Sequence, residues 1–514
     1  MTEMNLRLKI GQRLVTGLPG TELNDEFVDL VKEYKISNVI LFDRNVESSS
    51  QLKKLCADIQ KLVKEQTGHF AFISIDQEGG VVTRMPKDLY SMPGSMALAA
   101  TGKPENAYTA GLITAKELRS LGINFNLAPV LDVNTNKNNP VIGVRSYGST
   151  PDVVIKYGLE MIRGLTDGGV LCSAKHFPGH GDTDVDSHLD LPCVNKPMED
   201  LERVEFYPFK AAIDAGIPSI MSTHILFPAI EKQKLPATMS RTIITDLLKG
   251  RLGFKGLVIS DCLEMQAIQK FYGTANGAVA AAKAGIDLIL ISHTPSLVRE
   301  AVAAIEKAIE NGEISQKEMD ESVEKILSYK ATYADKKEEK LNCEEYRATV
   351  EKLIQESITL VNSPNGTIAD LGEKPLFVGS ISNRATVASS DVDKSLCFPK
   401  YMAEKFKCSY IQSAIDPDDN EIKEILGKTK GFSCIVFGTY NGNRNKGQVK
   451  LANALINTGM PTIVVSLRDP YDLGHIDKKA SMLAAYEYSP RSFDAVANVL
   501  SGRKKATGRI TVSL

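Results

Sequence analysis

The sequence feature that most constrains the fold is a regular alternation of short apolar runs with amphipathic stretches, which extends from residue 10 to about residue 330. Eight runs are candidate strands: Leu14–Val15, Val39–Phe42, Phe72–Ile75, Leu127–Val130, Leu171–Ala174, Ser219–Ser222, Leu257–Ser260 and Leu288–Ser292. Helical stretches lie between them, for example Glu26–Tyr34, Ala107–Leu121, Leu201–Ala215 and Pro295–Glu310. Apolar runs without polar alternation are typical of parallel strands that are buried on both faces. Eight β-α units in about 320 residues predict an α/β fold of the (β/α)8 TIM-barrel type, with a doubly wound sheet as the alternative.

A second, smaller α/β pattern follows the predicted barrel. The charged stretch Ala334-Asp-Lys-Lys-Glu-Glu-Lys-Leu indicates a solvated linker. Beyond it, apolar runs recur at Pro375–Gly379, Phe432–Phe437, Pro461–Ser466 and Ser481–Tyr486. We therefore expect a catalytic barrel over residues 1–335, a linker over 336–345 and a three-layer α/β sandwich domain over 346–514.

Composition excludes several classes of partner. The net charge of −2 argues against nucleic acid and anionic membranes, because both require a surplus of Lys and Arg. The eight cysteines include no CxxC pair, which favours reduced thiols in a cytoplasmic protein. The N-terminus shows no secretory leader, and nowhere do 18 apolar residues run together, so we expect a soluble chain without a membrane partner.

Ionisable residues directly follow many of the predicted strands. They are Asp76, Asp132, Lys175, His176, His224, Asp261 and His293. Because the loops that follow barrel strands form the active face, these residues predict one functional pocket. Any single one has a structural alternative: Asp261, with Glu264 three residues later, resembles a capping box that opens the next helix.

The densest polar stretch is Lys175-His-Phe-Pro-Gly-His-Gly-Asp-Thr-Asp-Val-Asp-Ser-His188. A metal site is one interpretation, although no HExxH or Cys/His spacing is present. An EF-hand fails, because Ser187 occupies the glycine position and Cys193 the position of the final Glu. The remaining interpretation is a glycine-hinged loop that carries an Asp186–His188 pair, in which the carboxylate orients an imidazole for acid/base work.

These segments resemble glycoside hydrolase family 3, and specifically its β-N-acetylglucosaminidase branch. The matching segments are Ile75-Asp-Gln-Glu-Gly-Gly80 with Arg84, Gly122-Ile-Asn-Phe-Asn-Leu-Ala-Pro-Val-Leu-Asp-Val133, Asn139-Pro-Val-Ile-Gly-Val-Arg-Ser146, Lys175-His-Phe-Pro-Gly-His-Gly181 with Asp186-Ser-His188, and Ile259-Ser-Asp-Cys-Leu-Glu-Met265. The second domain is similar to the sandwich of two-domain members, with a looser match at Gly438-Thr-Tyr-Asn441 and Ala506-Thr-Gly-Arg-Ile-Thr-Val512.

The resemblance implies a retaining exo-β-N-acetylglucosaminidase that needs no metal or other cofactor. Asp261 would be the nucleophile that forms a covalent glycosyl-enzyme, and His188, oriented by Asp186, would be the acid/base. The terminal sugar would be held by Asp76, Arg84, Arg145, Lys175 and His176. The implied substrate is a small soluble glycan with terminal N-acetylglucosamine, such as a muropeptide from cell-wall recycling.

Three alternatives remain open at this level. A phosphorylase of the same family would use phosphate in place of water, and a histidine acid/base would not repel that anion. A non-catalytic sugar-binding protein could use the same fold, although the intact Asp261, Asp186 and His188 argue against it. A metal-dependent hydrolase would lose activity to a strong chelator.

Overall fold

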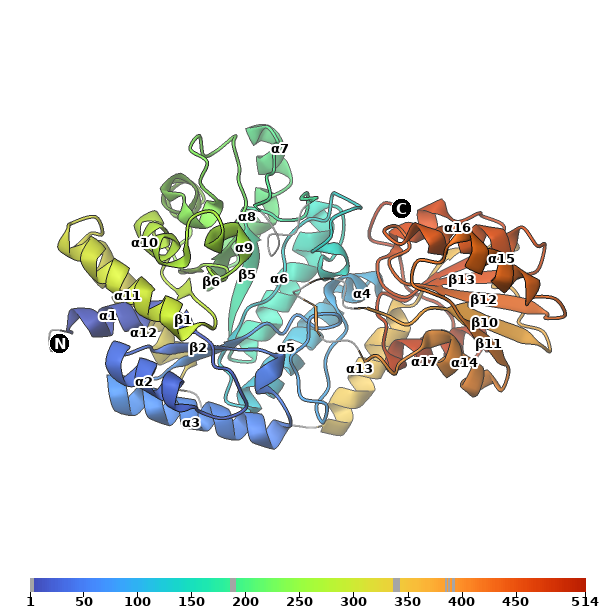
Figure 1. Cartoon of the computed structure of the whole chain (residues 1–514), viewed down its shortest axis with the longest axis horizontal. Coiled ribbons are helices and arrows are strands. Elements are labelled where there is room, and N and C mark those ends of the chain that lie inside the picture. Colours follow the sequence, from blue (N-terminus) through green and yellow to red (C-terminus); the bar gives the residue numbers. More distant parts are fainter. Residues whose placement is uncertain (1–3, 185–190, 336–342, 384–385, 387–388, 391–392) are drawn as a thin grey trace.

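The structure is a computed structural model that describes residues 4–184, 191–335, 343–383, 386, 389–390 and 393–514. Its first part is built around eight parallel strands, with the second part beside it along the long axis (Figure 1). The strands are β1 (Leu14–Thr16), β2 (Asn38–Leu41), β3 (Phe72–Ile75), β4 (Phe125–Asn126), β5 (Leu171–Phe177), β6 (Ser219–Ser222), β7 (Leu257–Ile259) and β8 (Ile289–Leu290). They pair in the order β7-β6-β5-β4-β3-β2-β1-β8, and a parallel bridge between Ile259 and Leu288 joins the two ends. The sheet therefore closes on itself, which confirms the (β/α)8 barrel and shows that the doubly wound alternative is wrong.

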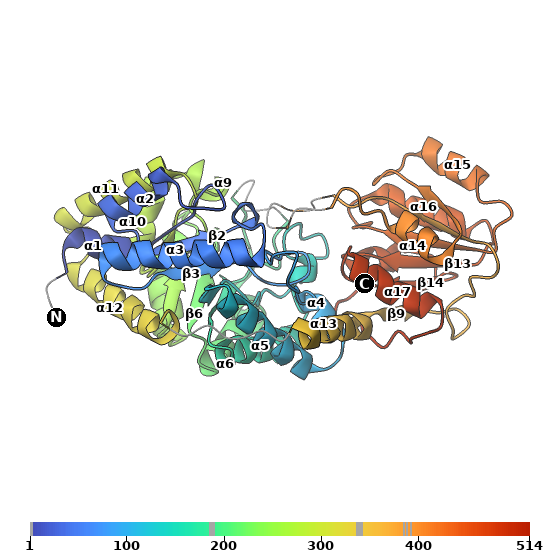
Figure 2. The ribbon, with the colours of Figure 1, turned by 90° about the horizontal axis from the view of Figure 1, so that it is seen from below.

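Helices surround the barrel, as Figure 2 shows from below. They are α1 (Leu6–Arg13), α2 (Asp25–Tyr34), α3 (Ser49–Thr67), α4 (Ser95–Ala100), α5 (Pro104–Ser120), α6 (Pro151–Asp167), α7 (Met198–Arg203), α8 (Phe206–Asp214), the π-helix η4 (Thr242–Arg251), α9 (Gln266–Gln269), α10 (Thr274–Ala284), α11 (Pro295–Glu310) and α12 (Gln316–Tyr333). A proline begins each of α5, α6 and α11, where the N–H that it lacks would have no partner inside the helix.

Two predicted elements of the barrel differ from the structure. The fourth strand is Phe125–Asn126, two residues before the predicted run. Beyond it Pro129 has no N–H for a regular ladder, and the segment contacts β5 irregularly through the carbonyl oxygens of Ala128 and Pro129. The helix predicted over Leu201–Ala215 is divided into α7 and α8. Pro208 explains the break, because its ring would clash with the carbonyl of Val204 in a continuous helix.

The second part is a six-stranded sheet between two helical layers. Its strands are β9 (Thr359–Asn362), β10 (Pro375–Gly379), β11 (Ser409–Gln412), β12 (Cys434–Thr439), β13 (Thr462–Ser466) and β14 (Ser481–Ala484), in the order β11-β10-β12-β13-β14-β9, with only β9 antiparallel. Its helices are α13 (Cys343–Ser357), α14 (Phe398–Phe406), α15 (Asp419–Gly427), α16 (Lys446–Ile456) and α17 (Pro490–Leu500).

Side chains of β10 show how the layers form. Phe377 packs in one apolar cluster with residues of α14 and α17, whereas Leu376 and Val378 pack in another with residues of α15 and α16. Successive strand residues face opposite sides of a sheet, so both faces are covered. The predicted three-layer α/β architecture is confirmed.

In the described part of the chain, no helix combines the length and the apolar character needed to cross a membrane.

Candidate active site

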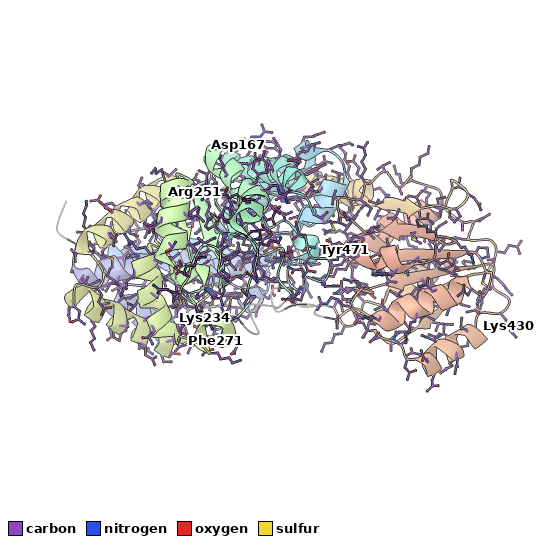
Figure 3. All side chains as sticks on the ribbon, turned by 90° about the horizontal axis from the view of Figure 1, so that it is seen from above. Asp167, Lys234, Arg251, Phe271, Lys430 and Tyr471 are labelled. Atoms are coloured by element: carbon purple, nitrogen blue, oxygen red, sulfur yellow. The ribbon has the colours of Figure 1, made fainter. Side chains whose placement is uncertain are left out.

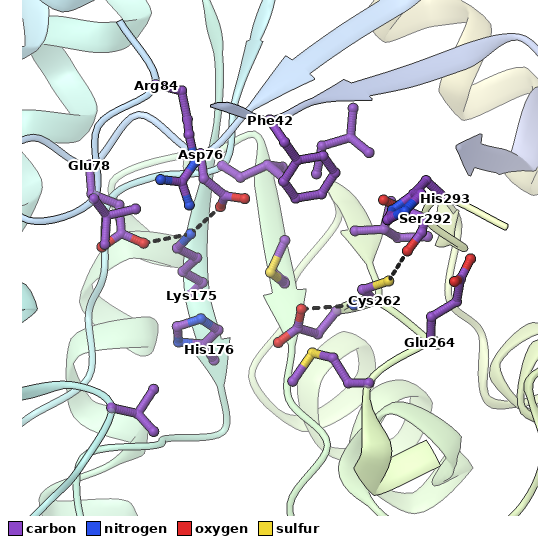
Figure 4. A pocket seen from close by; sticks show the side chains of 18 of the residues that line it. Phe42, Asp76, Glu78, Arg84, Lys175, His176, Cys262, Glu264, Ser292 and His293 are labelled. Atoms are coloured by element: carbon purple, nitrogen blue, oxygen red, sulfur yellow. Dashed lines mark hydrogen bonds and ion pairs between the residues drawn. The ribbon is translucent and has the colours of Figure 1, made fainter. Parts of the chain in front are cut away.

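A cavity of about 540 Å³ lies at the carboxyl ends of the barrel strands, which is within the usual range for small-molecule sites. Its lining includes six residues that the sequence analysis assigned to the site: Asp76, Arg84, Arg145, Lys175, His176 and Asp261. Figure 4 shows Lys175 and His176 on one wall, and Cys262, Glu264, Ser292 and His293 on the other. The closed barrel thus brings together distant side chains: among these six residues, Asp76 and Asp261 are 185 positions apart.

Four charged side chains form a buried cluster on the first wall. The Lys175 ammonium lies 2.6 Å from Asp76 Oδ1 and 2.8 Å from Glu78 Oε1. Arg145 donates two hydrogen bonds of 2.8 Å to the two oxygens of Glu78. The side chains of Glu78, Arg145 and Lys175 are 2–4% exposed, whereas that of Asp76 is 22% exposed and is the carboxylate best placed to meet a ligand.

The electrostatics keep Glu78 and Lys175 ionised in spite of their burial. Burial by itself would raise the pKa of Glu78, but Arg145 and Lys175 hold it well below its ordinary value. Burial opposes the charge on Lys175 as well, and the carboxylates of Asp76 and Glu78 raise its pKa in spite of that. Two fixed cations and two carboxylates in a nearly dry wall can hold the hydroxyl groups of a sugar with charge-assisted hydrogen bonds.

Asp132 lies behind this wall and fixes His176. Its Oδ2 atom lies 2.7 Å from Nδ1 of His176, and its Oδ1 atom accepts hydrogen bonds from the backbone N–H groups of His176 and His180. The hydrogen bond to the Asp132 carboxylate places a proton on Nδ1 of His176. Nε2 is therefore the ring nitrogen that Asp132 does not engage. Burial lowers the pKa of His180 to about 4, so this second ring is neutral.

The environment of Asp261 argues against its structural alternative. The next helix, α9, begins only at Gln266, and Met265 occupies its N-cap position without a capping hydrogen bond from its side chain. The Glu264 carboxylate instead accepts hydrogen bonds of 2.8 and 2.7 Å from the backbone and the hydroxyl of Thr294, which precedes α11. The interpretation of Asp261 and Glu264 as a capping box is therefore wrong. Both residues line the cavity, and Glu264 also joins two loops through Thr294.

Two other residues that follow strands, His224 and His293, lie in different places relative to the cavity. His224 is fully buried, with Nδ1 3.0 Å from the hydroxyl of Thr238 and Nε2 2.9 Å from the carbonyl oxygen of Cys262. It supports the loop after β7 from behind. His293 lines the cavity, and burial lowers its pKa.

Arg84 enters the cavity from the loop after β3. Its guanidinium Nη1 atom lies 3.0 Å from Asp43 Oδ2 and 2.9 Å from the hydroxyl of Ser390. The Arg84 side chain is 6% exposed, and Figure 4 shows its guanidinium beside Asp76. Phe42 is the only phenyl or phenol ring among the described residues of the lining, so it is the candidate for stacking on a sugar face in a chain without tryptophan.

Asp186 and His188 lie outside the described residues. The start of their loop is held tightly against the barrel. Gly181 packs so closely on the carbonyl of Val133 that a Cβ atom would lie 1.8 Å from that oxygen, and Gly179 has φ +150°. Only glycine fits such a close approach.

Sequence reasoning missed Glu78 as a site residue and left the partner of His176 unassigned. Glu78 stands two residues after Asp76 in the same loop, so the rule that selected Asp76 could have included it. Asp132 was noted at a strand end but received no role. Among the described residues, no three His, Cys, Asp or Glu side chains are grouped as metal ligands.

Known proteins share this architecture. The sequence profile of the glycosyl hydrolase family 3 N-terminal domain matches residues 5–329. A family 3 β-N-acetylglucosaminidase from Paenibacillus sp. str. FPU-7 has 38% sequence identity and a TM-score of 0.91, over 99% of both chains. Beta-hexosaminidase A of Pseudoalteromonas piscicida is 37% identical over 332 residues, which are 60% of this chain and 56% of that protein. The beta-hexosaminidase of Thiobacillus denitrificans is 33% identical over 299 residues, which are 57% of this chain and 81% of that protein.

The match thus covers only about half of the length of the Pseudoalteromonas relative. The barrel and the profile that matches it are those of the glycoside hydrolase class. Since the family profile covers more than half of the chain, the chain belongs to glycoside hydrolase family 3.

Proposed function

We propose that this chain is a retaining exo-β-N-acetylglucosaminidase. The observation that carries the proposal is a single cavity in which Asp261 lies with the charged cluster of Asp76, Glu78, Arg145 and Lys175. Such a cavity can offer a nucleophile to a sugar whose hydroxyl groups are held by fixed charges. The similarity to an N-acetylglucosaminidase over 99% of both chains supports the choice of sugar.

The proposed reaction has two steps. Asp261 attacks the anomeric carbon, the glycosidic bond breaks, and His188 donates a proton to the departing oxygen. The product of this step is a glycosyl ester of Asp261. His188 then takes a proton from water, which attacks the same carbon and releases the sugar with its original configuration. Asp186 is the proposed orienting partner of His188.

Side chains of the described wall are assigned to the terminal sugar. Asp76 and Lys175 bind hydroxyl groups, Arg84 and Arg145 contribute positive charge, and Nε2 of His176 offers a further hydrogen bond. Because these groups are held by their own hydrogen bonds before the sugar arrives, little ordering is needed on binding.

We further propose that the substrate is a small soluble glycan, such as a muropeptide from cell-wall recycling, and that the enzyme works in the cytoplasm. Free thiols, as expected in a reducing compartment, are present at Cys56, Cys172, Cys193, Cys262, Cys397, Cys408 and Cys434.

The first test is a panel of nitrophenyl glycosides with wild type and Asp261→Asn. We expect turnover of the β-N-acetylglucosaminide above the glucoside and galactoside, and its loss in Asp261→Asn with an unchanged circular-dichroism spectrum. The matched control is Glu264→Gln, which alters a neighbouring carboxylate that binds Thr294 and should keep activity within about tenfold of wild type. Near-normal turnover by Asp261→Asn would contradict the assignment.

The second test identifies the intermediate and the acceptor. With a dinitrophenyl substrate, His188→Ala should accumulate an adduct of one sugar residue on Asp261, detectable by mass spectrometry of the intact chain and its peptides. Product analysis with and without phosphate separates hydrolysis from phosphorolysis, since only the latter yields a sugar 1-phosphate. Binding of the sugar without any turnover would favour a sugar-binding protein, and inactivation by a chelator would favour a metal-dependent hydrolase.

A further inference from the structure

The second domain contacts the barrel at the residues that carry the pocket arginines. Tyr471, labelled in Figure 3, lies where the two parts meet. Its hydroxyl accepts a hydrogen bond of 2.6 Å from Asn134 of the barrel. Two further contacts of this interface, made by Ser390 and Asp469, lead directly to Arg84 and Arg145.

Ser390 belongs to the segment between β10 and α14 and binds the loop that carries Arg84. Its hydroxyl donates to the carbonyl of Thr83 (2.6 Å) and accepts from the N–H of Thr83 (2.8 Å) and from Nη1 of Arg84 (2.9 Å). Its own N–H donates to the carbonyl of Val81 at 2.9 Å. A hydroxyl has one donor and two lone pairs. Thr83 and Arg84 therefore use the whole hydrogen-bonding capacity of the Ser390 hydroxyl.

Asp469 binds the turn that carries Arg145. Its Oδ1 atom accepts a hydrogen bond of 2.9 Å from the N–H of Val144, in the 3-10 turn η2 (Gly143–Arg145). Gly143 has φ +46°, and a Cβ atom there would lie 2.4 Å from Asp469 Oδ1, so glycine allows this close approach. Asp469 is 4% exposed, which makes the contact a dry one.

We propose that the second domain positions the pocket arginines. Ser390 holds Arg84 through a hydrogen bond to its guanidinium, and Asp469 holds the turn that carries Arg145. The inference rests on the proposed function in one respect, that these arginines bind the substrate. It assigns the second domain a role in the pocket of the barrel.

The need for such support follows from the chemistry of arginine. A long side chain loses conformational entropy about several rotatable bonds when it is held in one place. This loss opposes substrate binding unless the side chain is already ordered in the free enzyme. Asp43, another partner of Arg84 Nη1, is one-third exposed and offers a solvent-screened ion pair. The Ser390 hydroxyl binds both the backbone and the guanidinium side of the loop, so it restricts the position of the charge more than Asp43 does.

The test is a double-mutant cycle of Ser390→Ala and Arg84→Ala, assayed on the N-acetylglucosaminide. Ser390→Ala should lower kcat/KM by roughly tenfold, mainly through a higher KM, because it removes a hydrogen bond to a charged group. In the Arg84→Ala background the same change should have no further effect. Ser390→Thr keeps the hydroxyl and should retain most of the activity.

The matched control is Lys103→Ala, which breaks an exposed ion pair of 3.0 Å with Glu356 of α13, away from the pocket lining. Its kinetics should equal those of wild type. A parallel pair tests Asp469: Asp469→Ala should raise KM, whereas Asp469→Asn, which keeps an acceptor oxygen for Val144, should retain the wild-type value.

Crystal structures of wild type and Ser390→Ala separate this inference from the proposed function. We expect the Arg84 guanidinium to lose its single position in the variant. If wild type cleaves N-acetylglucosaminides and Ser390→Ala has unchanged kinetics, or if the two substitutions are additive, the positioning role is refuted while the function stands. If wild type does not cleave them, the function fails, and an unmoved, well-ordered Arg84 in Ser390→Ala would refute the positioning role separately.

Discussion

Replacement of Glu78 by an apolar residue tests whether the buried charge cluster exists for binding or for stability. Glu78→Met removes the carboxylate that binds Arg145 through two hydrogen bonds and Lys175 through one. All three side chains are at most 4% exposed, so in the variant Arg145 stays buried without the carboxylate that it contacts, while Lys175 keeps Asp76. Removal of one partner of a buried ion pair costs about 3–5 kcal/mol.

The assay is urea unfolding followed by circular dichroism, together with thermal unfolding. For an unfolding unit of roughly 330 residues, a loss of this size corresponds to a fall of the melting temperature of about 4–7 °C. The informative comparison is the double variant Glu78→Met/Arg145→Met, in which no unpaired charge remains at this pair and Lys175 keeps Asp76. Apolar replacement of a whole buried pair is often neutral or stabilising, so the double variant should recover most of the lost free energy of unfolding.

Activity should behave differently from stability. The double variant lacks Arg145, so its kcat/KM on the N-acetylglucosaminide should stay below that of wild type even though its stability is recovered. An unfolding free energy of Glu78→Met within about 1 kcal/mol of wild type would refute the reasoning about burial, because such a value belongs to exposed ion pairs. A stable and fully active double variant would refute the binding role of the cluster.

Three further predictions concern separate groups. Asp132→Asn should lower kcat/KM roughly 10–100-fold with the fold intact, because a charge-assisted hydrogen bond orients His176; unchanged kinetics would show that this ring is not used. Burial raises the pKa of Glu117 to about 8, so its contribution to stability is full below the ordinary carboxyl pKa and is lost as the pH rises towards 8. Glu117→Gln should therefore gain up to about 5 kcal/mol relative to wild type between pH 4 and pH 8.5 in urea unfolding, and a pH-independent difference would disprove the shift. In a leaving-group series, His188→Ala should impair substrates with poor leaving groups about 10²–10⁴-fold more than activated ones, with a weaker effect for Asp186→Ala; equal losses across the series would assign the proton to another group.

The barrel could be predicted because its signal is local. Strands buried on both faces must be apolar at every position, and the run at Phe72–Ile75 coincides with β3. Helix α11 was also predicted with its observed ends, since Pro295 marks its first turn. Errors occurred where a local signal was ambiguous, as at Pro129 after β4 and at Pro208 in α8.

Two strands of the second domain carry no such signal. The edge strand Ser409–Gln412 is largely exposed and mixes polar with apolar residues. The antiparallel strand Thr359–Asn362 is only half-buried and is defined by its pairing with β14. Edge positions do not require a continuous apolar run, so their sequences resemble loops.

By itself, the sequence determined the succession of β-α units, the three-layer second domain and the face that carries the ionisable residues, because each follows from local periodicity and from what comes directly after a strand. Only the tertiary structure decided the place of each of these residues. Glu78 lies at the centre of the charge cluster, Asp132 and His224 lie behind the pocket, and Glu264 binds Thr294. It alone brought Ser390 to Arg84 across 306 positions. Such partnerships depend on closure of the sheet and docking of the second domain, and no local pattern encodes which distant side chain arrives at a given charge.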